Sequence, residues 1–273
     1  LESPDIHPKF KFNRNSYSKL ELKELAYSLI KEGEDYENSI GNFLTDWFDG
    51  NTTITLQTSG STGKPKSISL KKQHMVNSAL ATGEFFDLKP GDKALLCLSA
   101  DFIAGKMMLV RAMVLGLELD SVNPSSQPMA GISKTFDFVA MVPLQLENSL
   151  NALHQIKTLI IGGAAMSDKL KAQAQAQVHA STSLSNQLKV QPFDCAQGDI
   201  LQNQKEATAI FETYGMTETI THVAVKSINT GLWLRSATEQ DQSLEAEPFD
   251  HAQDKLRRSF VAMPHVHFST DNR

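Results

Sequence analysis

The residues best suited to chemistry form a short segment near residue 60 that is rich in glycine and hydroxyl groups. It reads Thr58-Ser59-Gly60-Ser61-Thr62-Gly63-Lys64-Pro65-Lys66. Its glycines let backbone N–H groups approach phosphate oxygens, its hydroxyls add donors, and Lys64 and Lys66 add positive charge. The segment therefore predicts a loop that holds a triphosphate, and the alternative is a flexible surface turn.

A phosphate loop of the kinase or GTPase type does not fit this segment. Such a loop needs a glycine at its first position and Ser or Thr directly after Gly-Lys. Here Thr58 stands at the first position, and Pro65 follows Lys64. These two residues exclude that class.

A second chemistry-bearing segment, expected to form a turn, reads Glu212-Thr213-Tyr214-Gly215-Met216-Thr217-Glu218-Thr219. Tyr214 can offer an aromatic face to a base, Thr217 a hydroxyl to a phosphate, and Glu218 a hard oxygen ligand to magnesium. Alone, this segment is weak evidence, because such residues more often pack or face solvent.

Together the two segments resemble those of the adenylate-forming superfamily, which includes acyl-CoA ligases, luciferases and peptide-synthetase adenylation domains. The family's phosphate loop is similar to TSGSTGKPK and its adenine motif to YGMTE. The resemblance implies an ATP site, and its implied residues are Thr58, Ser59, Gly60, Ser61, Thr62, Gly63, Lys64, Gly162, Gly163, Ala164, Glu212, Tyr214, Gly215 and Met216. For Gly162 and Gly163 the alternative is an ordinary turn at the end of a strand.

The same resemblance implies a reaction. The carboxylate of an acid attacks the α-phosphorus of Mg-ATP, pyrophosphate leaves, and the thiol of coenzyme A then displaces AMP. The implied catalytic residues are Lys66, Thr217 and Glu218, with Glu218 also the Mg²⁺ ligand.

A finer resemblance points to the o-succinylbenzoate–CoA ligases of menaquinone synthesis. It rests on the segments 102–111 and 266–271, which read FIAGKMMLVR and VHFSTD. Phe102, Lys106 and Arg111 are the implied substrate-binding residues, and the alternative for the two cations is a solvated helix face.

The chain is expected to form the N-terminal ATP- and acyl-binding domain, over residues 1–273, without the family's small C-terminal domain. This expectation leaves two other functions open. One is a remnant that binds ATP without turnover, and the other is a nucleotide-responsive interaction protein.

The elements that must position these residues alternate between helix and strand. Periodicity predicts helices at 18–30, 40–48, 72–86, 103–115 and 143–154, and strands at 52–57, 67–70, 93–98, 117–122, 138–142 and 158–161. This order predicts an α/β fold with a mainly parallel sheet flanked by helices, and ligand sites beyond the carboxyl ends of its strands.

Two polar stretches interrupt this order. Residues 171–204 and 236–247 are interpreted as loops or inserts, and the phrases PFDCAQ and PFDHAQ place inserts near 181–206 and 230–258. A turn motif shared by the two phrases is the alternative. The flanking sequences do not match, so a repeat architecture is excluded.

Composition narrows the class of protein further. The chain has 273 residues, 41% of them apolar, and a net charge of −5, which argues against nucleic acid as the main partner. Its two cysteines support neither a disulfide framework nor a metal site, as is usual in a reducing cytoplasm. No apolar stretch reaches the roughly 20 residues that a membrane helix needs, and the first ten residues lack a signal-peptide core.

Overall fold

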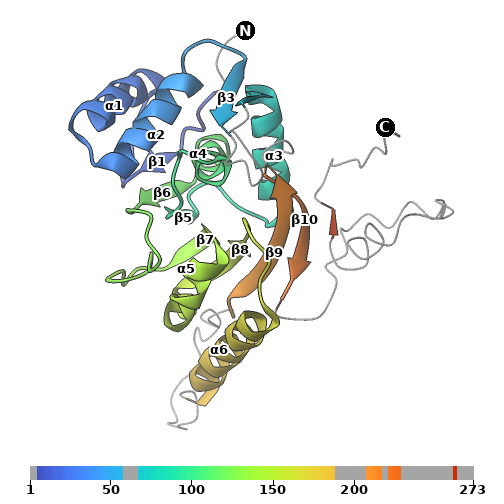
Figure 1. Ribbon diagram of the computed structural model, residues 1–273. Helices are drawn as coiled ribbons and strands as arrows, with labels where there is room; N and C mark the ends of the chain where they lie inside the picture. The colour runs from blue at the N-terminus through green and yellow to red at the C-terminus, as the bar shows by residue number, and fades with distance from the viewer. Residues whose placement is uncertain (1–4, 58–66, 188–206, 217–220, 229–260, 263–273) are drawn as a thin grey trace, which may run out of the picture.

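The computed structural model describes residues 5–57, 67–187, 207–216, 221–228 and 261–262, and these form a sheet with helices on both faces (Figure 1). The strands of this sheet are β1 (Lys11–Phe12), β2 (Asn15–Ser16), β5 (Lys93–Leu96), β6 (Glu118–Ser121), β7 (Phe136–Met141), β8 (Ile156–Ile161), β9 (Ala209–Met216), β10 (Thr221–Ser227) and β11 (Val261–Ala262). A separate hairpin pairs β3 (Thr53–Gln57) with β4 (Ser67–Lys71). The helices are α1 (Lys19–Glu32), α2 (Asp35–Trp47), α3 (Lys72–Phe85), α4 (Ile103–Leu115), α5 (Pro143–Glu147), the 3₁₀ helix η1 (Leu150–Gln155) and α6 (Asp168–Gln187).

The centre of the sheet is parallel, as the alternating order predicts. Its strand order is β11-β10-β9-β8-β7-β5-β6-β1-β2 in the described part of the chain. Every neighbouring pair from β9 to β1 is parallel, and antiparallel pairs occur only towards the two edges. The expected α/β fold with a mainly parallel sheet is therefore confirmed.

Each face of the sheet buries its own apolar cluster. Side chains of adjacent strand residues point to opposite faces, so Ala94 and Leu96 join the cluster under α3 and α4, whereas Leu95 and Cys97 join the cluster under α5, η1 and α6. A strand that is apolar at every position, as β5 nearly is, is typical of a sheet covered on both sides.

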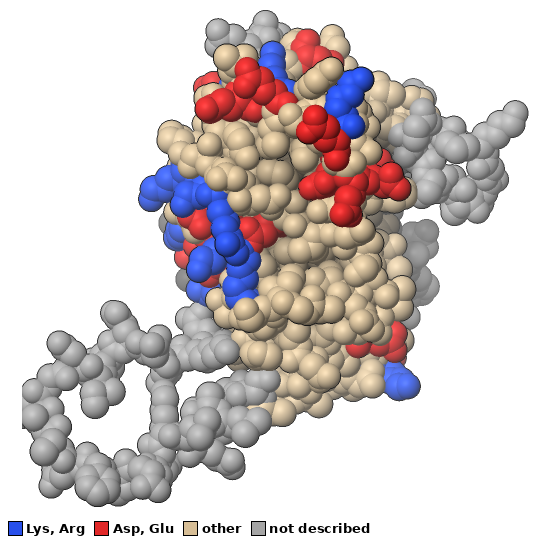
Figure 2. All heavy atoms as spheres, turned by 90° about the vertical axis from the view of Figure 1, so that its left-hand side faces the viewer, with Lys and Arg blue, Asp and Glu red and all other residues tan. Residues whose placement is uncertain are grey.

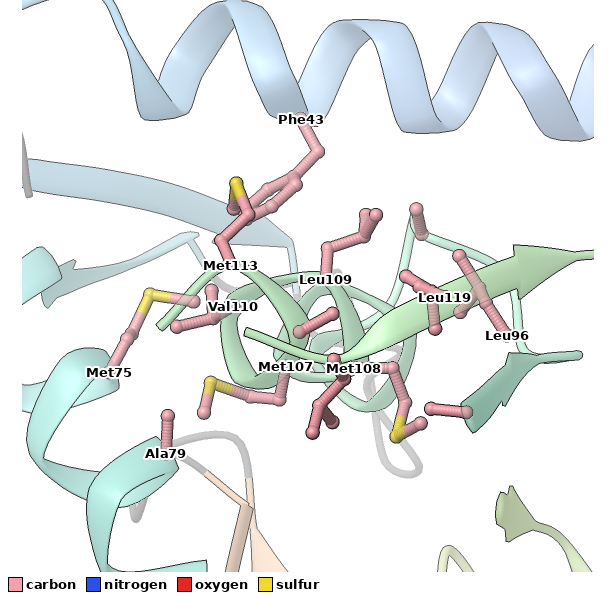
Figure 3. Close-up of a cluster of buried hydrophobic side chains, with 14 of the residues drawn as sticks. Phe43, Met75, Ala79, Leu96, Met107, Met108, Leu109, Val110, Met113 and Leu119 are labelled. Carbon is pink, nitrogen blue, oxygen red and sulfur yellow. The ribbon is translucent and has the colours of Figure 1, made fainter. Parts of the chain in front are cut away.

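Helix α4 lies at the centre of the larger cluster. Figure 3 shows side chains from α2, α3, β5 and β6 arranged around it, among them Phe43, Met75 and Leu119. Its residues from Gly105 to Met113 are all buried. A helix that is covered on every side has no solvent face, which explains its nearly continuous apolar sequence.

The pair α1–α2 closes the outer side of this cluster. Helix α1 begins with a capping box, in which the Ser18 N–H donates to Glu21 Oε2 at 2.7 Å and the Glu21 N–H donates to Ser18 Oγ at 3.3 Å. The two helices approach closely at Gly41, where a Cβ atom would lie 2.6 Å from the Ala26 carbonyl oxygen.

The loop interpretation of residues 171–204 is wrong for Lys171–Gln187, which belong to α6. Alanine and glutamine favour helices, and Ser167 Oγ accepts the Leu170 N–H at the helix start. Leu170, Ala174 and Val178 recur at a spacing of four and are buried on η1 and β8. Residues 188–204 of that stretch lie outside the described residues. The second polar stretch, 236–247, and the phrases PFDCAQ and PFDHAQ lie outside them as well.

The single helix predicted at 143–154 is also wrong, because it is divided into α5 and η1. The Gln145 side chain donates to the Cys97 carbonyl at 2.8 Å and to the Ser125 carbonyl at 2.9 Å, which fixes the start of α5 to its neighbours. The Asn148 side-chain amide donates to the Leu144 carbonyl at 3.1 Å, competing with the helical backbone bonds at this point.

In the described ranges, no helix combines the length and the apolar character needed to cross a membrane.

Because Ala174 is fully buried and Ala176 is exposed on the same helix, the pair gives a matched test of how α6 packs. Ala174→Glu should lower the free energy of unfolding by about 2–4 kcal/mol, since it places a carboxylate in an apolar contact. Ala176→Glu should change it by less than about 0.5 kcal/mol. Urea unfolding measures both, and equal effects would contradict the observed packing.

Candidate functional site

The candidate site lies at the carboxyl ends of β8 and β9, which are parallel neighbours. Ile161 is paired with Glu212 in their register. The residues that follow, Gly162–Ala164 and Thr213–Gly215, therefore lie side by side at this edge. Two segments that the sequence separates by about fifty positions are brought together here by strand pairing.

The two glycines of this edge are required by its geometry. A Cβ atom on Gly162 would lie 2.7 Å from Thr213 Oγ1, and that hydroxyl donates to the Ile161 carbonyl at 3.0 Å. Gly163 has a φ of +82°, a conformation that favours glycine. Gly163 and Ala164 are exposed. The two glycines thus lie in a turn directly after β8, which leaves backbone accessible to a ligand, and their role towards a nucleotide stays a prediction.

Glu212 braces this turn from within the protein. Glu212 is only 7% exposed. Its Oε1 accepts the Met166 N–H at 3.0 Å, and its Oε2 forms an ion pair with Lys171 Nζ at 2.9 Å. Both carboxylate oxygens thus bind the segment after β8, and Glu212 acts here as a positioning residue.

Lys171 is a residue of this site that sequence reasoning does not identify. Its partner is 41 positions away along the chain, and the polar composition of residues 171–204 carries no periodic signal that would place Lys171 on the first turns of a helix facing β9.

Tyr214 lies on the exposed part of β9. It is 42% exposed, which is high for an aromatic side chain, and Gly215 beside it is also exposed. The expected turn is wrong for Glu212–Met216, because these residues continue β9 and pair with β10. The strand position carries Tyr214 to the same edge as Gly163.

The predicted phosphate loop, Thr58–Lys66, lies outside the described residues, as do Thr217 and Glu218. Its flanks are described: Gln57 pairs with Ser67 at the end of the β3–β4 hairpin. The two strands that flank the segment are therefore present where the sequence predicts them, and they pair with each other.

Lys72 fixes the base of this hairpin to α2. Its Nζ donates to the Trp47 carbonyl at 3.0 Å and to Asp49 Oδ1 at 2.8 Å, and its N–H donates to the Thr52 carbonyl at 2.9 Å. Lys72 is only 3% exposed, so the ammonium side of its ion pair with Asp49 is shielded from water. No sequence pattern indicates this ion pair.

Helices α3 and α4 meet at their C-terminal ends. Helix α4 follows β5 and so begins at the carboxyl edge. A Cβ atom on Gly83 would contact Leu115, and Arg111 Nε donates to Thr82 Oγ1 at 3.2 Å, so the last turns of α3 and α4 lie together.

The three predicted substrate residues lie on α4 at different depths. Phe102 caps the helix and is 56% exposed. Lys106 is nearly buried, donates to the Ala100 carbonyl, and lies 5.6 Å above the Phe43 ring. Arg111 is completely buried one to two turns further on. The solvated-face interpretation of the two cations is therefore wrong, and their role towards substrate stays a prediction.

Burial changes the acidity of both cations. It lowers the pKa of Lys106, against the attraction of Asp101 and Asp46. It lowers the pKa of Arg111 to about 9, so the guanidinium still carries its charge at neutral pH. The interior beneath this edge is therefore electropositive. Within the described residues, no three His, Cys, Asp or Glu side chains converge as metal ligands.

A parallel sheet with a glycine turn and an exposed aromatic residue at its carboxyl edge is typical of α/β proteins, whose ligand sites lie at that edge. A family model described as AMP-binding enzyme matches residues 15–187, more than half of the chain. The chain therefore belongs to the AMP-binding enzyme family.

Individual relatives agree with this family. The acyl-CoA synthetase (AMP-forming)/AMP-acid ligase II-like protein from Dyadobacter fermentans is 30% identical with a TM-score of 0.61, over 91% of this chain and 58% of that one. A linear gramicidin synthase of Brevibacillus parabrevis is 28% identical over 168 residues, which are 59% of this chain and 2% of that protein. The chain thus spans little more than half of the first and a small part of the second.

A third likeness is to E. coli MenE with bound OSB-AMS. It is 23% identical with a TM-score of 0.47, over 65% of this chain and 33% of that one. At this distance the likeness says nothing about which acid the present chain binds.

The Glu212 contacts can be tested by a double-mutant cycle with Lys171. Glu212→Gln should lower the free energy of unfolding by about 1–3 kcal/mol, because Lys171 Nζ loses its partner in a mostly shielded place. Lys171→Met should cost at least as much, since it leaves the buried Glu212 carboxylate without its cation. The coupling energy from urea unfolding should exceed about 0.5 kcal/mol, and strict additivity would argue against the brace.

The ion pair of Lys72 predicts a pH effect. Its hydrogen bond to Asp49 lowers the pKa of that carboxyl, so the pair stabilises the fold at neutral pH and this contribution disappears as pH falls below Asp49's ordinary range near 4. Because Asp49 is 32% exposed, the contribution stays below about 1 kcal/mol. Asp49→Asn should therefore be less stable than the unmodified chain at pH 7 and equally stable near pH 2. A constant difference across this range would contradict the assignment.

Proposed function

We propose that this chain is the larger, ATP-binding part of an adenylate-forming ligase, one that activates a carboxylic acid as its acyl-adenylate. Membership of the AMP-binding enzyme family supports this proposal. The structural observation that carries it is the pairing of Ile161 with Glu212, which sets the Gly162–Ala164 turn beside Tyr214.

This edge suits an adenine ring. A base needs an exposed aromatic face and a backbone that comes close without side-chain obstruction. Tyr214 supplies the first and Gly163 the second, and both are accessible. We assign Tyr214 to stacking on adenine and Gly162–Ala164 to the nucleotide and acyl pocket.

The triphosphate and metal ends of the site rest on the sequence motifs. We assign Thr58–Lys66 to the β- and γ-phosphates, Thr217 to the α-phosphate and Glu218 to Mg²⁺. Bound Mg²⁺ would offset the charge of the phosphate oxygens. The resemblance of both segments to the motifs of one nucleotide-binding family supports their convergence on one nucleotide.

The proposed chemistry overcomes the poor electrophilicity of a carboxylate. A carboxylate oxygen attacks the α-phosphorus of ATP, and the bond from that phosphorus to the bridging oxygen breaks to release pyrophosphate. In a second step the coenzyme A thiol loses its proton and attacks the acyl carbon, and AMP leaves. The chain's task in the first step is to position the reactants and to stabilise negative charge.

We further propose an anionic aromatic acid, o-succinylbenzoate, as the substrate, and so a place in menaquinone synthesis. The motif resemblance at 102–111 and 266–271 suggests it. The electropositive interior around Lys106 and Arg111 is compatible with an acid carrying a second carboxylate, because a buried cation attracts an anion at the edge above it.

ATP–pyrophosphate exchange tests the activity and the substrate together. The exchange rate should depend on o-succinylbenzoate and exceed by at least about tenfold the rates with benzoate, hexanoate and other acids. Exchange that depends on a different acid would support the ligase activity and would exclude o-succinylbenzoate as the substrate. ATP binding without exchange for any acid would identify a nucleotide-binding remnant and reject the ligase.

The assignment of Glu218 has its own test. Glu218→Gln should lower the exchange rate about 10²-fold or more, as is usual when one transition-state partner is lost. Glu147→Gln makes the same change at an exposed position on α5 and should leave the rate unaltered. An unchanged rate in Glu218→Gln would remove this residue from the mechanism.

A further inference from the structure

A cavity separate from the candidate site lies on the opposite side of the sheet from α3 and α4. Its volume is about 380 Å³, within the range of small-molecule sites. Helices α5, η1 and α6 cover β7, β8 and β9 on this face. The chain from β6 to β7, residues 122–135, crosses β5 without a helix, so the sheet under it is covered only by irregular chain and a hollow remains.

The floor of the cavity is apolar. Leu95 from β5 and Phe136 from β7 line it, and both belong to the buried cluster of this face. Val122 and Ile132 complete this part of the lining and pack against the same cluster. A small apolar group would therefore be shielded from water at the bottom of the cavity.

The rim is polar and is held in place by the turn between β1 and β2. The Asn13 amide donates to Ser121 Oγ at 3.0 Å, and the Ser121 N–H donates to Asn13 Oδ1 at 2.8 Å. This double contact fixes Arg14, the next residue, at the cavity mouth. In the part of the chain that the structure describes, the Arg14 guanidinium has no hydrogen-bond or ion-pair partner, so its fork of donors is available.

Lys134 stands on the other wall. Its Nζ forms an ion pair with Asp120 and lies 5.3 Å from the centre of the Phe136 ring. Burial lowers the pKa of Lys134, and the nearby charges of Arg14 and Lys93 lower it further, against the attraction of Glu118. The lining thus holds two cations, Arg14 and Lys134, and one carboxylate, Asp120, so one positive charge remains at the mouth.

The surrounding surface adds to this charge. Figure 2 shows several Lys and Arg side chains in a band on the face that includes β1 and β6, with some Asp and Glu side chains beside them, although the chain as a whole is acidic. A basic band around a cavity raises the local concentration of anions.

We propose that this cavity binds a small organic anion, with its carboxylate or phosphate between Arg14 and Lys134 and its apolar body on Leu95 and Phe136. Carboxylate groups, which are planar, and phosphate groups, which are tetrahedral, both carry charged oxygens that accept hydrogen bonds from a guanidinium or an ammonium. The cavity is larger than a free inorganic ion requires, so the ligand carries a ring or short chain. It shares no residue with the turn Gly162–Ala164 or with Tyr214, and the inference is independent of the proposed ligase activity.

Titration of the ¹⁵N-labelled chain tests the proposal, with benzoate, phenyl phosphate, inorganic phosphate and the neutral benzyl alcohol as probes. Benzoate, phenyl phosphate or both should shift the amide signals of Ser121 and Gly131, and the stronger of the two identifies the preferred oxyanion. Inorganic phosphate and benzyl alcohol, which each lack one half of the ligand, should bind at least about tenfold more weakly. Equal binding of benzyl alcohol, or no saturable shift with either anion, would overturn the proposal.

Variants locate the binding in this cavity. Arg14→Gln and Lys134→Gln should each raise the Kd about tenfold or more, the usual loss for one charge-assisted hydrogen bond. Ser133→Phe keeps the net charge and should abolish binding by filling the cavity. Lys169→Gln removes the same charge at an exposed position of α6 and should leave the Kd unchanged.

Equal affinities in all four variants would place the anion elsewhere and reject the site. Pyrophosphate exchange in Arg14→Gln should equal that of the unmodified chain, so a failed ligase assay and a failed anion site remain separate results.

Discussion

The candidate site depends on one buried carboxylate. The Glu212 side chain points from β9 towards the interior and binds the Met166 N–H and the ammonium of Lys171. These contacts fix the start of α6 and the glycine turn before it relative to the sheet. If the turn were free, Gly163 and Tyr214 would share an edge only by strand register. With the brace, the backbone at this edge is positioned before any ligand arrives, which reduces the entropy lost on binding. The residue that sets the geometry is thus one that uses both of its oxygens within the protein.

A second constraint is the complete enclosure of α4. Because helices pack on it from two sides and the sheet from a third, its cations cannot reach water, and Arg111 and Lys106 must satisfy their donors with carbonyls, a hydroxyl and an aromatic face. Burying charge in this way is costly, and a fold retains it only where other interactions compensate. The helix therefore brings positive potential under the sheet edge without presenting any charge at the surface.

The sequence predicts well those features that depend on neighbours along the chain. The capping box at Ser18, the bounds of α4 and the parallel core follow from local periodicity and caps. The failures have a common origin in contacts between distant residues. The α6 helix escapes prediction because its apolar stripe consists of small and widely spaced side chains such as Ala174, and the roles of Glu212 and Lys171 appear only once β9 and α6 are side by side. The cavity at Arg14 is unpredictable for the same reason, since it results from a missing helix between two strands.

The β3–β4 hairpin has its own mechanical consequence. It forms a two-stranded sheet apart from the main one, with its base tied to α2 through Lys72. Five residues of strand extend from that base, so the end at Gln57 and Ser67 lies roughly 17 Å away. A tilt of about 5° at the base would displace the hairpin end by about 1.5 Å, and the burial of Ile54, Leu56 and Leu70 in the main apolar cluster opposes such a tilt. Lys72 at the base and these buried side chains along the strands together determine where the hairpin end lies.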